Sequence, residues 1–352
     1  MNKDFSNELT PEIKEKMKKN LIYLVMFSVV MVFAGLTSAY IVSMGDSFWL
    51  KYNLPAAFYI STTVIIISSF LVHFGIQAAK KGKQTNSKIL IVSAFIFGAS
   101  FIYFQFKGYS KLIEDGVHPV SNHIIVTEGR YGDYFELKYK GQFVDVDGNN
   151  YYVSGHKMTS AQFSAIQKFM IQFEKFDPSK PLNIANYGSD FILYYKQQPV
   201  GLINGKMTLP DGKELQFVDL YRLQSLAVNI GDGRGDFFVK GEIGKDFNIY
   251  YKGKKLDYKN RELYFKGRKL SKYYQIKVID TADTATSYLY LITILHLLHI
   301  VFTLFYMAKM TLQSVMGKIT ADNTLSIRVG AIFWHFLGIL WIYLFIFLIY
   351  IH

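Results

Sequence analysis

Five apolar runs constrain this chain more than any other feature of its sequence. They cover roughly 21–43, 55–79, 88–106, 285–308 and 329–351. Each run is close to the ~20 apolar residues that an α-helix needs to cross a hydrocarbon core ~30 Å thick. A helix satisfies its backbone hydrogen bonds within the segment, as lipid requires. The sequence therefore predicts a multi-pass membrane protein with five transmembrane helices.

The composition agrees with apolar residues gathered into blocks, because the chain is 51% hydrophobic although 19% of its residues are charged. It has no cysteine. That excludes Cys-ligated zinc, iron–sulfur clusters, covalently attached haem and thiolate-bridged copper. The net charge of +12 lies partly beside the apolar runs, where lysine and arginine set topology. We therefore expect no nucleic-acid partner.

The apolar runs also predict the domain organisation. We expect a cytoplasmic N-terminal segment over 1–20, transmembrane helices one to three over 21–106, an insertion over 107–284, and helices four and five over 285–352. The insertion is long enough to have its own core. The expected fold is an all-α transmembrane bundle with an inserted, extracytoplasmic β-rich (α+β) domain. No signal-peptide cleavage pattern precedes the first run, so we expect that span to be retained.

Short loops rich in lysine stay in the cytoplasm, whereas long loops are exempt from this rule. The predicted cytoplasmic cations are Lys14, Lys16, Lys18, Lys19, Lys80, Lys81, Lys83, Lys88, Lys309, Lys318 and Arg328. The other short loop, Met44 to Leu54, carries only Lys51 and Asp46. The pattern places the N-terminus inside, and the insertion and the C-terminus outside.

Alternating aromatic and polar residues between glycine-containing turns predict hairpins in the insertion. Asp147-Gly148-Asn149 separates two such runs, and Asn204-Gly205 and Asp211-Gly212 mark further turns. One helix is predicted from Thr159 to about Lys175, where Asp177-Pro178 stops it. We interpret its apolar stripe as core, not as a cofactor site. The stripe comprises Phe163, Ile166, Phe169, Met170 and Phe173.

A short repeat appears at 250–256 and again at 264–270. It predicts paired Lys-Gly turns in hairpins, and two copies are too few for a solenoid. The basic stretch is either a docking surface for an acidic partner or anionic headgroups, or a solvated strand edge that lysine keeps from pairing. Its candidate docking residues are Lys254, Lys255, Arg261, Lys266, Arg268 and Lys269.

Metal-site signals are weak. His118, His123 and His156 are scattered, and the loop from Asp232 to Asp236 has too few acids for an EF-hand. We expect no metal at either place.

The spans contain no charged residue at depth, so a relay of buried carboxylates is not predicted. His296 and His299 are three residues apart and share a helix face. They are either haem or metal ligands, or hydrogen-bonding residues that pack helices together. Only His335 offers a further ligand at comparable depth, so we favour packing.

Motifs on successive spans resemble one family. They are Phe33-Ala34-Gly35-Leu36 with Ala39-Tyr40, Trp49 with Pro55, Gln105, Thr293-x-x-His296-x-x-His299, and Trp334-His335-Phe336 with Trp341. In this order they resemble subunit III of haem–copper cytochrome c oxidases, in the five-helix bacterial form, over residues 21–116 and 285–352. The candidates for bundle packing, or for contact with lipid or subunit I, are Trp49, Gln105, His296, His299, Trp334, His335 and Trp341.

Three positions depart from the family pattern. Val29, Gly108 and Gly338 stand where the family usually has carboxylates. The large insertion is also not part of the usual pattern. These departures put in doubt any proton delivery by a carboxylate of this chain.

The resemblance implies a non-catalytic subunit III of a proton-pumping terminal oxidase, which stabilises subunit I and supports proton uptake in aerobic respiration. Haem and copper are then expected in partner subunits, with no cofactor in this chain. The implied partners are subunits I and II and membrane phospholipid, with a cytochrome c or another respiratory complex as a further partner of the insertion. The implied location is the bacterial cytoplasmic (inner) membrane.

Two other classes were weighed. A membrane-anchored sensor or receptor would bind a ligand with its extracytoplasmic domain, but the predicted cytoplasmic parts are too short for a signalling domain. A membrane enzyme would need a charged site in the membrane or a nucleophile motif, and the sequence offers neither.

Overall fold

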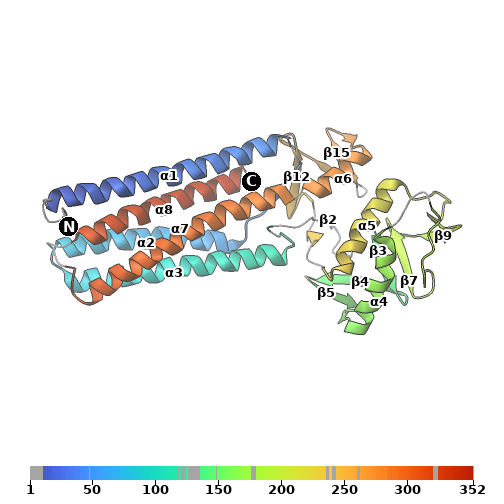
Figure 1. The fold of residues 1–352 in the computed structure, drawn as a ribbon, viewed down its shortest axis with the longest axis horizontal. Coiled ribbons are helices and arrows are strands. Elements are labelled where there is room, and N and C mark those ends of the chain that lie inside the picture. The colour runs from blue at the N-terminus through green and yellow to red at the C-terminus, as the bar shows by residue number, and fades with distance from the viewer. Residues whose placement is uncertain are drawn as a thin grey trace, which may run out of the picture. The chain divides into compact units, whose positions relative to one another are not determined.

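The computed structural model describes residues 11–46, 48–117, 119, 124–125, 135–147, 149–175, 180–234, 238–239, 243–259, 262–281, 283–319 and 324–351. The chain forms two compact units. The first comprises Met1–Val42, Leu54–Ser110 and Tyr288–His352, and the second comprises Ser43–Asn53 and Lys111–Ser287. Figure 1 traces the elements of both units in chain order.

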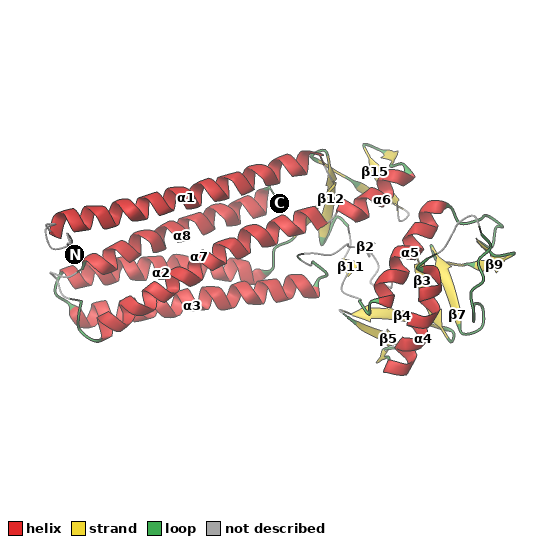
Figure 2. Cartoon of the chain, in the orientation of Figure 1, coloured by secondary structure: helices red, strands yellow, loops and turns green. Residues whose placement is uncertain are grey.

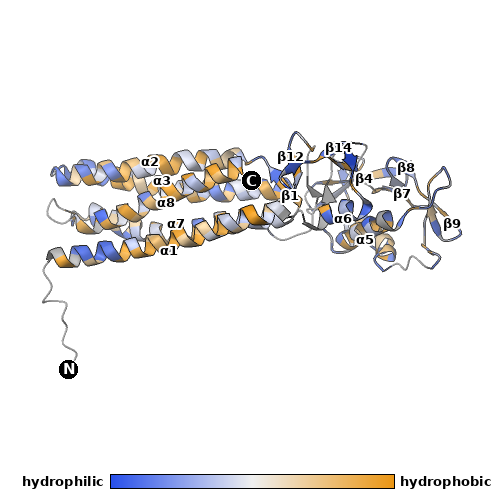
Figure 3. Cartoon of the chain, turned by 90° about the horizontal axis from the view of Figure 1, so that it is seen from above, coloured by the Kyte–Doolittle hydropathy of each residue, from blue (hydrophilic) through white to orange (hydrophobic). Residues whose placement is uncertain are grey.

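The first unit is a helical bundle. Its helices are α1 (Pro11–Asp46), α2 (Ala56–Lys80), α3 (Gln84–Glu114), α7 (Asp283–Val315) and α8 (Leu325–Tyr350). All five are long and apolar enough to cross a membrane, and they lie side by side with apolar residues along their length (Figures 1 and 3). The five predicted spans and the predicted transmembrane bundle are confirmed.

The third helix is longer than its apolar run. We expected the span to end near residue 106, but α3 continues to Glu114. Lys111 forms ion pairs with Glu114 at 3.3 Å and with Asp115 at 3.0 Å. Pairs three and four residues apart stabilise a helix exposed to water, so these charges extend the helix beyond its apolar part.

The second unit combines short strands with helices (Figure 2), which confirms the predicted β-rich insertion. Its strands are β1 (Phe48–Tyr52), β2 (Ile124–Ile125), β3 (Phe135–Tyr139), β4 (Gln142–Asp147), β5 (Asn150–Val153), β6 (His156–Lys157), β7 (Phe191–Tyr195), β8 (Gln198–Pro199), β9 (Gly201–Ile203), β10 (Lys206–Thr208), β11 (Phe238–Val239), β12 (Phe247–Tyr251), β13 (Lys254–Lys255), β14 (Asp257–Lys259), β15 (Glu262–Phe265) and β16 (Arg268–Lys269). Its helices are α4 (Ser160–Met170), the 3₁₀ turn Ile171–Phe173, α5 (Phe217–Gly231) and α6 (Lys272–Thr281).

The largest sheet has the strand order β6-β5-β4-β3-β7-β8, and its β4–β5 hairpin confirms the predicted pairing around residue 148.

The predicted helix from Thr159 is also confirmed, as α4. The side chain of Thr159 accepts a hydrogen bond from the Gln162 backbone, and the Gln162 side chain accepts one from the Thr159 backbone. This capping box fixes the start of α4. The predicted apolar stripe faces the core. Asp177-Pro178, Gly148, His118, His123, Gly235, Asp236 and Arg261 lie outside the described residues.

Both copies of the short Lys-Gly repeat that we expected form hairpins, β12–β13 and β15–β16, and both lie within the last copy of a larger repeat that occurs three times. The first strands β3, β7 and β12 begin at Phe135, Phe191 and Phe247, so successive copies are 56 positions apart (191 − 135 and 247 − 191). Each copy continues with a tight turn, a return strand, a second hairpin and a helix. We call residues 135–170, 191–231 and 247–281 the first, second and third repeats.

Equivalent hydrogen bonds close the last hairpin before the helix in every repeat. The backbone N–H groups of Met158, Leu215 and Leu270 donate to the carbonyls of Tyr151, Met207 and Leu263, at 2.8, 2.9 and 3.0 Å respectively. The three acceptors are again 56 positions apart, and each donor residue stands just before a helix. The helices that follow are α4, α5 and α6. The repeat is therefore a conserved piece of backbone geometry within this chain.

The first turn of each repeat has the same unusual conformation. Both central residues have positive φ in Lys140-Gly141 (50° and 82°), Lys196-Gln197 (49° and 65°) and Lys252-Gly253 (48° and 68°). Hairpin turns of this mirror-image type match the twist of the flanking strands. Each lysine ammonium also lies 5.4–5.5 Å from the centroid of the tyrosine ring before it.

The third repeat pairs with strand β1. The second repeat pairs in the same way with β3 of the first repeat. The β1 sequence Phe-Trp-Leu-Lys-Tyr is close to the Phe-Glu-Leu-Lys-Tyr of β3. β1 pairs antiparallel with β12, from Phe48 opposite Tyr251 to Tyr52 opposite Phe247, as β3 pairs with β7. We treated this segment as a plain loop between two spans, and the structure corrects that interpretation.

We predict that Lys51→Cys with Asn248→Cys forms a disulfide in mild oxidant, because these residues lie directly opposite in the β1–β12 pair and such side chains are about 5 Å apart. The chain has no other cysteine, so gel mobility before and after reduction measures the bond. The matched control, Lys51→Cys with Tyr250→Cys, is displaced by two residues and should cross-link poorly. Equal cross-linking of both pairs would contradict the register.

Candidate functional site

The bundle has a buried polar and aromatic cluster to which every one of the five helices contributes. We call it the bundle-core cluster. Its members are Phe33 of α1, Ser61 and Thr62 of α2, Phe101 and Gln105 of α3, His296 of α7 and Trp341 of α8, all of them buried.

Three hydrogen bonds in the cluster join different helices. Gln105 Nε2 donates to Ser61 Oγ at 2.9 Å, and Trp341 Nε1 donates to Thr62 Oγ1 at 2.9 Å. His296 Nε2 donates to the backbone carbonyl of Leu337 at 3.0 Å. These bonds connect α3 to α2, α8 to α2 and α7 to α8. In a membrane, such interhelical bonds specify which faces meet.

The rings of the cluster pack around His296. Its ring centroid lies 6.3 Å from that of Phe33, 6.2 Å from that of Phe101 and 5.1 Å from that of Trp341. Phe101 and Trp341 meet edge-to-face at 5.3 Å, a favourable geometry for aromatic pairs. One imidazole therefore fills the space among three helices.

The other histidines make different hydrogen bonds, although the His299 ring also lies 5.9 Å from that of Phe33. His299 Nδ1 donates to the Leu295 carbonyl of its own helix at 2.7 Å. His335 Nδ1 shares a hydrogen bond with Ser69 Oγ, and its ring is 6.3 Å from that of His73. Within the described ranges, no three His, Asp or Glu side chains are grouped as metal ligands would be.

The remaining predicted tryptophans lie in different units. Trp334 is fully buried in the bundle, where a Cβ on Gly98 would come within 2.9 Å of its ring. Glycine at position 98 therefore lets α3 approach this ring. Trp49 is a buried residue of β1 in the second unit, opposite Tyr250. The structure does not bring it together with the bundle-core cluster.

Positions 29, 108 and 338 differ in the space that they leave for a side chain. A Cβ on Gly108 would lie 2.7 Å from Phe58 Cε2, and the Phe58 ring itself stacks on Trp341. Val29 is buried. A Cβ on Gly338 would make only an ordinary contact with Ile65, at 3.9 Å. At position 108 the ring of Phe58 thus occupies the space that a side chain would need.

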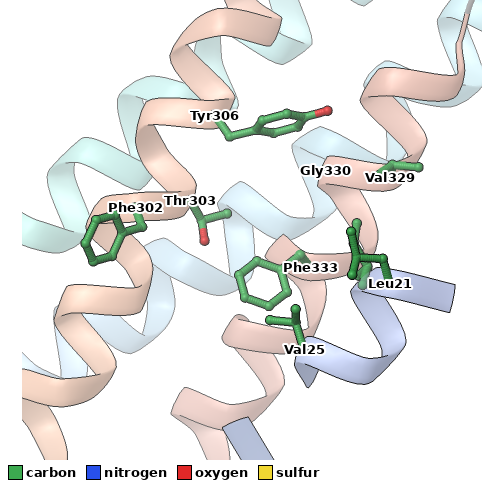
Figure 4. A pocket seen from close by; sticks show the side chains of 9 residues that line it. Leu21, Val25, Phe302, Thr303, Tyr306, Val329, Gly330 and Phe333 are labelled. Atoms are coloured by element: carbon green, nitrogen blue, oxygen red, sulfur yellow. The ribbon is translucent and has the colours of Figure 1, made fainter. Parts of the chain in front are cut away.

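A pocket of about 320 Å³ lies between α1, α7 and α8 (Figure 4). Its walls are mostly apolar, and it was not foreseen from the sequence. A Cβ on Gly330 would meet Tyr306 Cε1 at 2.5 Å, so glycine leaves room for the tyrosine ring in the wall. The sequence signal that could have indicated this pocket was Gly330, a glycine within the last apolar run. The lining residues are Leu21, Ile22, Val25, Phe302, Thr303, Tyr306, Val329, Gly330 and Phe333.

The predicted docking lysines and Arg268 lie on β13, on β16 and in the turn before β16, and all are exposed. Lys269 pairs with Glu262 at 2.7 Å, and Lys196 of the second repeat approaches the same carboxylate at 3.3 Å. Partial burial opposes ionisation of Glu262, but the hydrogen bond from Lys269 and the charge of Lys196 hold its pKa below the ordinary value. Glu262 thereby links the second and third repeats.

We predict that Trp341→Ala lowers the free energy of unfolding of the bundle by about 3–5 kcal/mol, because it removes a large buried ring. Thr62→Val removes the hydroxyl that accepts the Trp341 hydrogen bond, and such bonds average about 0.6 kcal/mol in membranes. Denaturation in detergent micelles followed by circular dichroism measures both. Equal losses would show that the hydrogen bond, not the ring packing, dominates the cluster.

Comparison with known proteins identifies one family. Residues 260–352, which include α7 and α8, match the model for "Cytochrome c oxidase subunit III". No curated protein and no solved structure matches the chain. The resemblance that we noted for the last two spans is confirmed, while that of residues 21–116 stays a prediction. Over residues 260–352, which include its last two spans, this chain is similar to the cytochrome c oxidase subunit III family.

Proposed function

We propose that this chain is the non-catalytic subunit III of a proton-pumping haem–copper terminal oxidase, where it stabilises subunit I and supports proton uptake. The observation that carries the proposal is the family match over both C-terminal spans. The two helices of that match also provide His296 and Trp341 to the bundle-core cluster. Subunits I and II are the proposed partners, and they carry the haem and copper.

Within this proposal, the polar residues of the spans hold helices together. His296 and His299 each donate to a backbone carbonyl, and Gln105 and Trp341 donate to hydroxyl groups. Such side chains act as polar contacts between or along helices. Trp334 and His335 take the same packing role on α8. This use of their donors favours packing over metal ligation.

The apolar pocket between α1, α7 and α8 suits an acyl chain of a membrane phospholipid. Its only polar side chains are those of Thr303 and Tyr306 (Figure 4). The Thr303 hydroxyl already donates to the His299 carbonyl at 2.8 Å. An apolar cavity of this kind gains by excluding water, so lipid is the proposed occupant.

We place the chain in the bacterial cytoplasmic membrane, with its N-terminus inside and its insertion outside. The lysine-rich short loops support this orientation. Glu15 of α1 pairs with Arg328 of α8 at 3.1 Å and with Lys19 at 2.6 Å. The first and last spans therefore begin at the same end of the bundle, as the proposed topology requires.

The insertion is proposed to dock neighbouring subunits or the electron donor, a cytochrome c or another respiratory complex. Arrays of repeats present extended surfaces for binding, and the first and second repeats share one six-stranded sheet. The electron donor of such an oxidase is delivered on the outer face, where the proposed topology puts these repeats.

One observation favours the receptor alternative. A cavity of about 220 Å³ between the second and third repeats is lined by charged groups, including Arg222, Asp219, Glu262 and Lys269. A small charged ligand would suit such a lining. Purification of the native complex decides between the two functions, because only an oxidase subunit brings haem-containing partners with it.

We predict that His296→Gln reduces co-purification of subunit I about threefold, since one interhelical bond of about 0.6 kcal/mol is weakened. The optical spectrum of the remaining complex should keep its haem bands unchanged. The matched control is His156→Gln, which changes an exposed histidine of the insertion. A lost or shifted haem band at unchanged assembly would make His296 a ligand, and absence of haem proteins from the wild-type preparation would refute the proposed function.

The docking proposal is tested by replacing residues 115–282 with a short linker and strand 48–52 with Gly-Ser, because β1 loses its partner when the repeats are removed. We expect unchanged turnover with an artificial electron donor and a several-fold loss with the natural donor, or loss of a neighbouring subunit. Oxygen consumption and subunit composition measure these effects. Full activity with the natural donor and a complete set of subunits would contradict it.

A further inference from the structure

The three repeats share a backbone but differ sharply in charge. Between the end of the first strand and the residue before the helix, the first repeat (139–158) has two lysines and two acids, and the second (195–215) has three and two. The third (251–270) has eight lysines and arginines against two acids. Since the fold is common to all three, the fold does not require the excess of cations.

The cations of the third repeat gather at its two Lys-Gly turns. The rings of Tyr251 and Phe265, which precede these turns, meet edge-to-face with centroids 5.3 Å apart. Lys252 lies over the first ring at 5.5 Å and Lys266 over the second at 5.3 Å. The ring contact therefore brings both turns together and combines their charges into one surface, which we call the basic surface. Its cations are Lys252, Lys254, Lys255, Lys266, Arg268 and Lys269.

Most of this charge is available to a partner. Lys254, Lys255 and Arg268 are exposed, and among the residues that the structure describes, only Lys269 of the basic surface is in an ion pair, with Glu262. Surface cations without an adjacent carboxylate retain their attraction for an external anion.

An aromatic cluster connects the basic surface to β1. Phe48 stacks on Tyr251 with centroids 4.4 Å apart, and Tyr274 of α6 lies 6.1 Å from Phe48 and 5.7 Å from Tyr251. Phe48 is the first residue of β1, whose entire length pairs with β12. The turns, β1 and α6 thus form one packed group within the second unit.

The covalent chain joins this group directly to two membrane spans. Only residue 47 separates α1 from β1, and only residue 282 separates α6 from α7. Consecutive Cα atoms are about 3.8 Å apart, so the chain allows at most about 8 Å between the last residue of α1 and Phe48, comparable to the Debye length of ~8 Å in physiological salt. The first repeat has no such connection, because residues 115–134 separate it from α3.

We propose that the basic surface of the third repeat binds the phosphate groups of anionic phospholipids in the leaflet where α1 ends and α7 begins. Clusters of four to eight cations beside a span attract anionic headgroups. Tyr273, next to the cluster on α6, is 66% exposed, and tyrosine is favoured at the membrane–water interface. The bound headgroups would hold the third repeat against the bilayer while the first two repeats remain available to protein partners.

A strand edge kept from pairing explains the charge less well. The short strands β6 and β8 at the ends of the six-stranded sheet, His156-Lys157 and Gln198-Pro199, carry a single lysine between them. If lysine served only to protect edges, these strands would need it as much as β13 and β16. The excess of cations is instead found in the third repeat, which is joined directly to the spans in the chain.

The test is hydrogen exchange of the full chain in nanodiscs of phosphatidylcholine with graded fractions of phosphatidylglycerol. We expect exchange of residues 250–272 to slow as the anionic fraction rises, and the effect to disappear at high salt. The equivalent residues 138–158 and 194–215 are internal controls and should not respond. Equal slowing in all three repeats, or no slowing in any, would overturn the proposal.

Charge-neutralising variants sharpen the test. Lys254→Gln, Lys255→Gln, Lys266→Gln and Arg268→Gln together should abolish the response, since each cation removed near an anionic surface weakens binding about fivefold. The matched control removes four lysines from the other repeats, at positions 140, 157, 206 and 213, and should respond as wild type does.

Unchanged hydrogen exchange of β1 and β12 in pure phosphatidylcholine verifies that each variant is folded. If a variant does not fold, the comparison of wild-type protein in different lipids still tests the proposal. Protection of residues 250–272 only after oxidase subunits are added, without dependence on phosphatidylglycerol, would overturn the lipid assignment in favour of an acidic protein. The measurement uses the isolated chain, so its failure is distinguishable from failure of the proposed oxidase role.

Discussion

Every backbone N–H and C=O in the hydrocarbon core must be hydrogen-bonded within the protein, and the rest of this structure depends on that constraint. It requires helices for the five apolar runs. It also favours polar side chains that find a partner at depth, as Gln105 and Trp341 do with hydroxyl groups of α2. The bundle-core cluster is the result: a few polar contacts, surrounded by aromatic rings, that select how the helices meet.

The cluster explains how a bundle can pack specifically when its described spans have no carboxylate at depth. Lipid is as apolar as leucine, so apolar side chains alone give little preference for one helix packing over another. Directional bonds from His296 and Trp341 supply that preference, and ring packing supplies contact area. Phe58 fills the space beside Gly108 and stacks on Trp341. Glycine at position 108 thus allows the ring packing of Phe58.

The inserted unit follows a different constraint. Short strands cannot be stable alone, so each repeat depends on a neighbour: the second repeat on β3 and the third on β1. Because β1 lies between two spans, the last repeat is joined to the membrane part at its strand and at α6, whereas the first is not. One backbone unit can then serve two environments, with an excess of cations in the repeat that is joined directly to the spans and nearly balanced charges in the other two.

Much of this could be predicted from the sequence. Periodicity and length determined the five spans, the β-rich insertion, the helix from Thr159, and the Lys-Gly turns, because these features depend on local pattern. The sequence identified the histidines and tryptophans of the bundle as candidate packing residues, but it did not show which of them contact one another. Whether His296 approached Trp341 or His335 depended on helix rotation, which a chain position does not encode.

Other features were decided only by the tertiary structure. The strand β1 looks like a loop because it is buried on both faces and has no alternation, and its partner β12 is 199 positions later (247 − 48). The 56-residue repeat was missed because the side chains of its three copies diverged while their turns and hydrogen bonds did not. Sequence alone determined which segments enter the membrane, since that depends on composition over one run. Tertiary structure decided which side chains meet, since that depends on contacts between residues far apart in the chain.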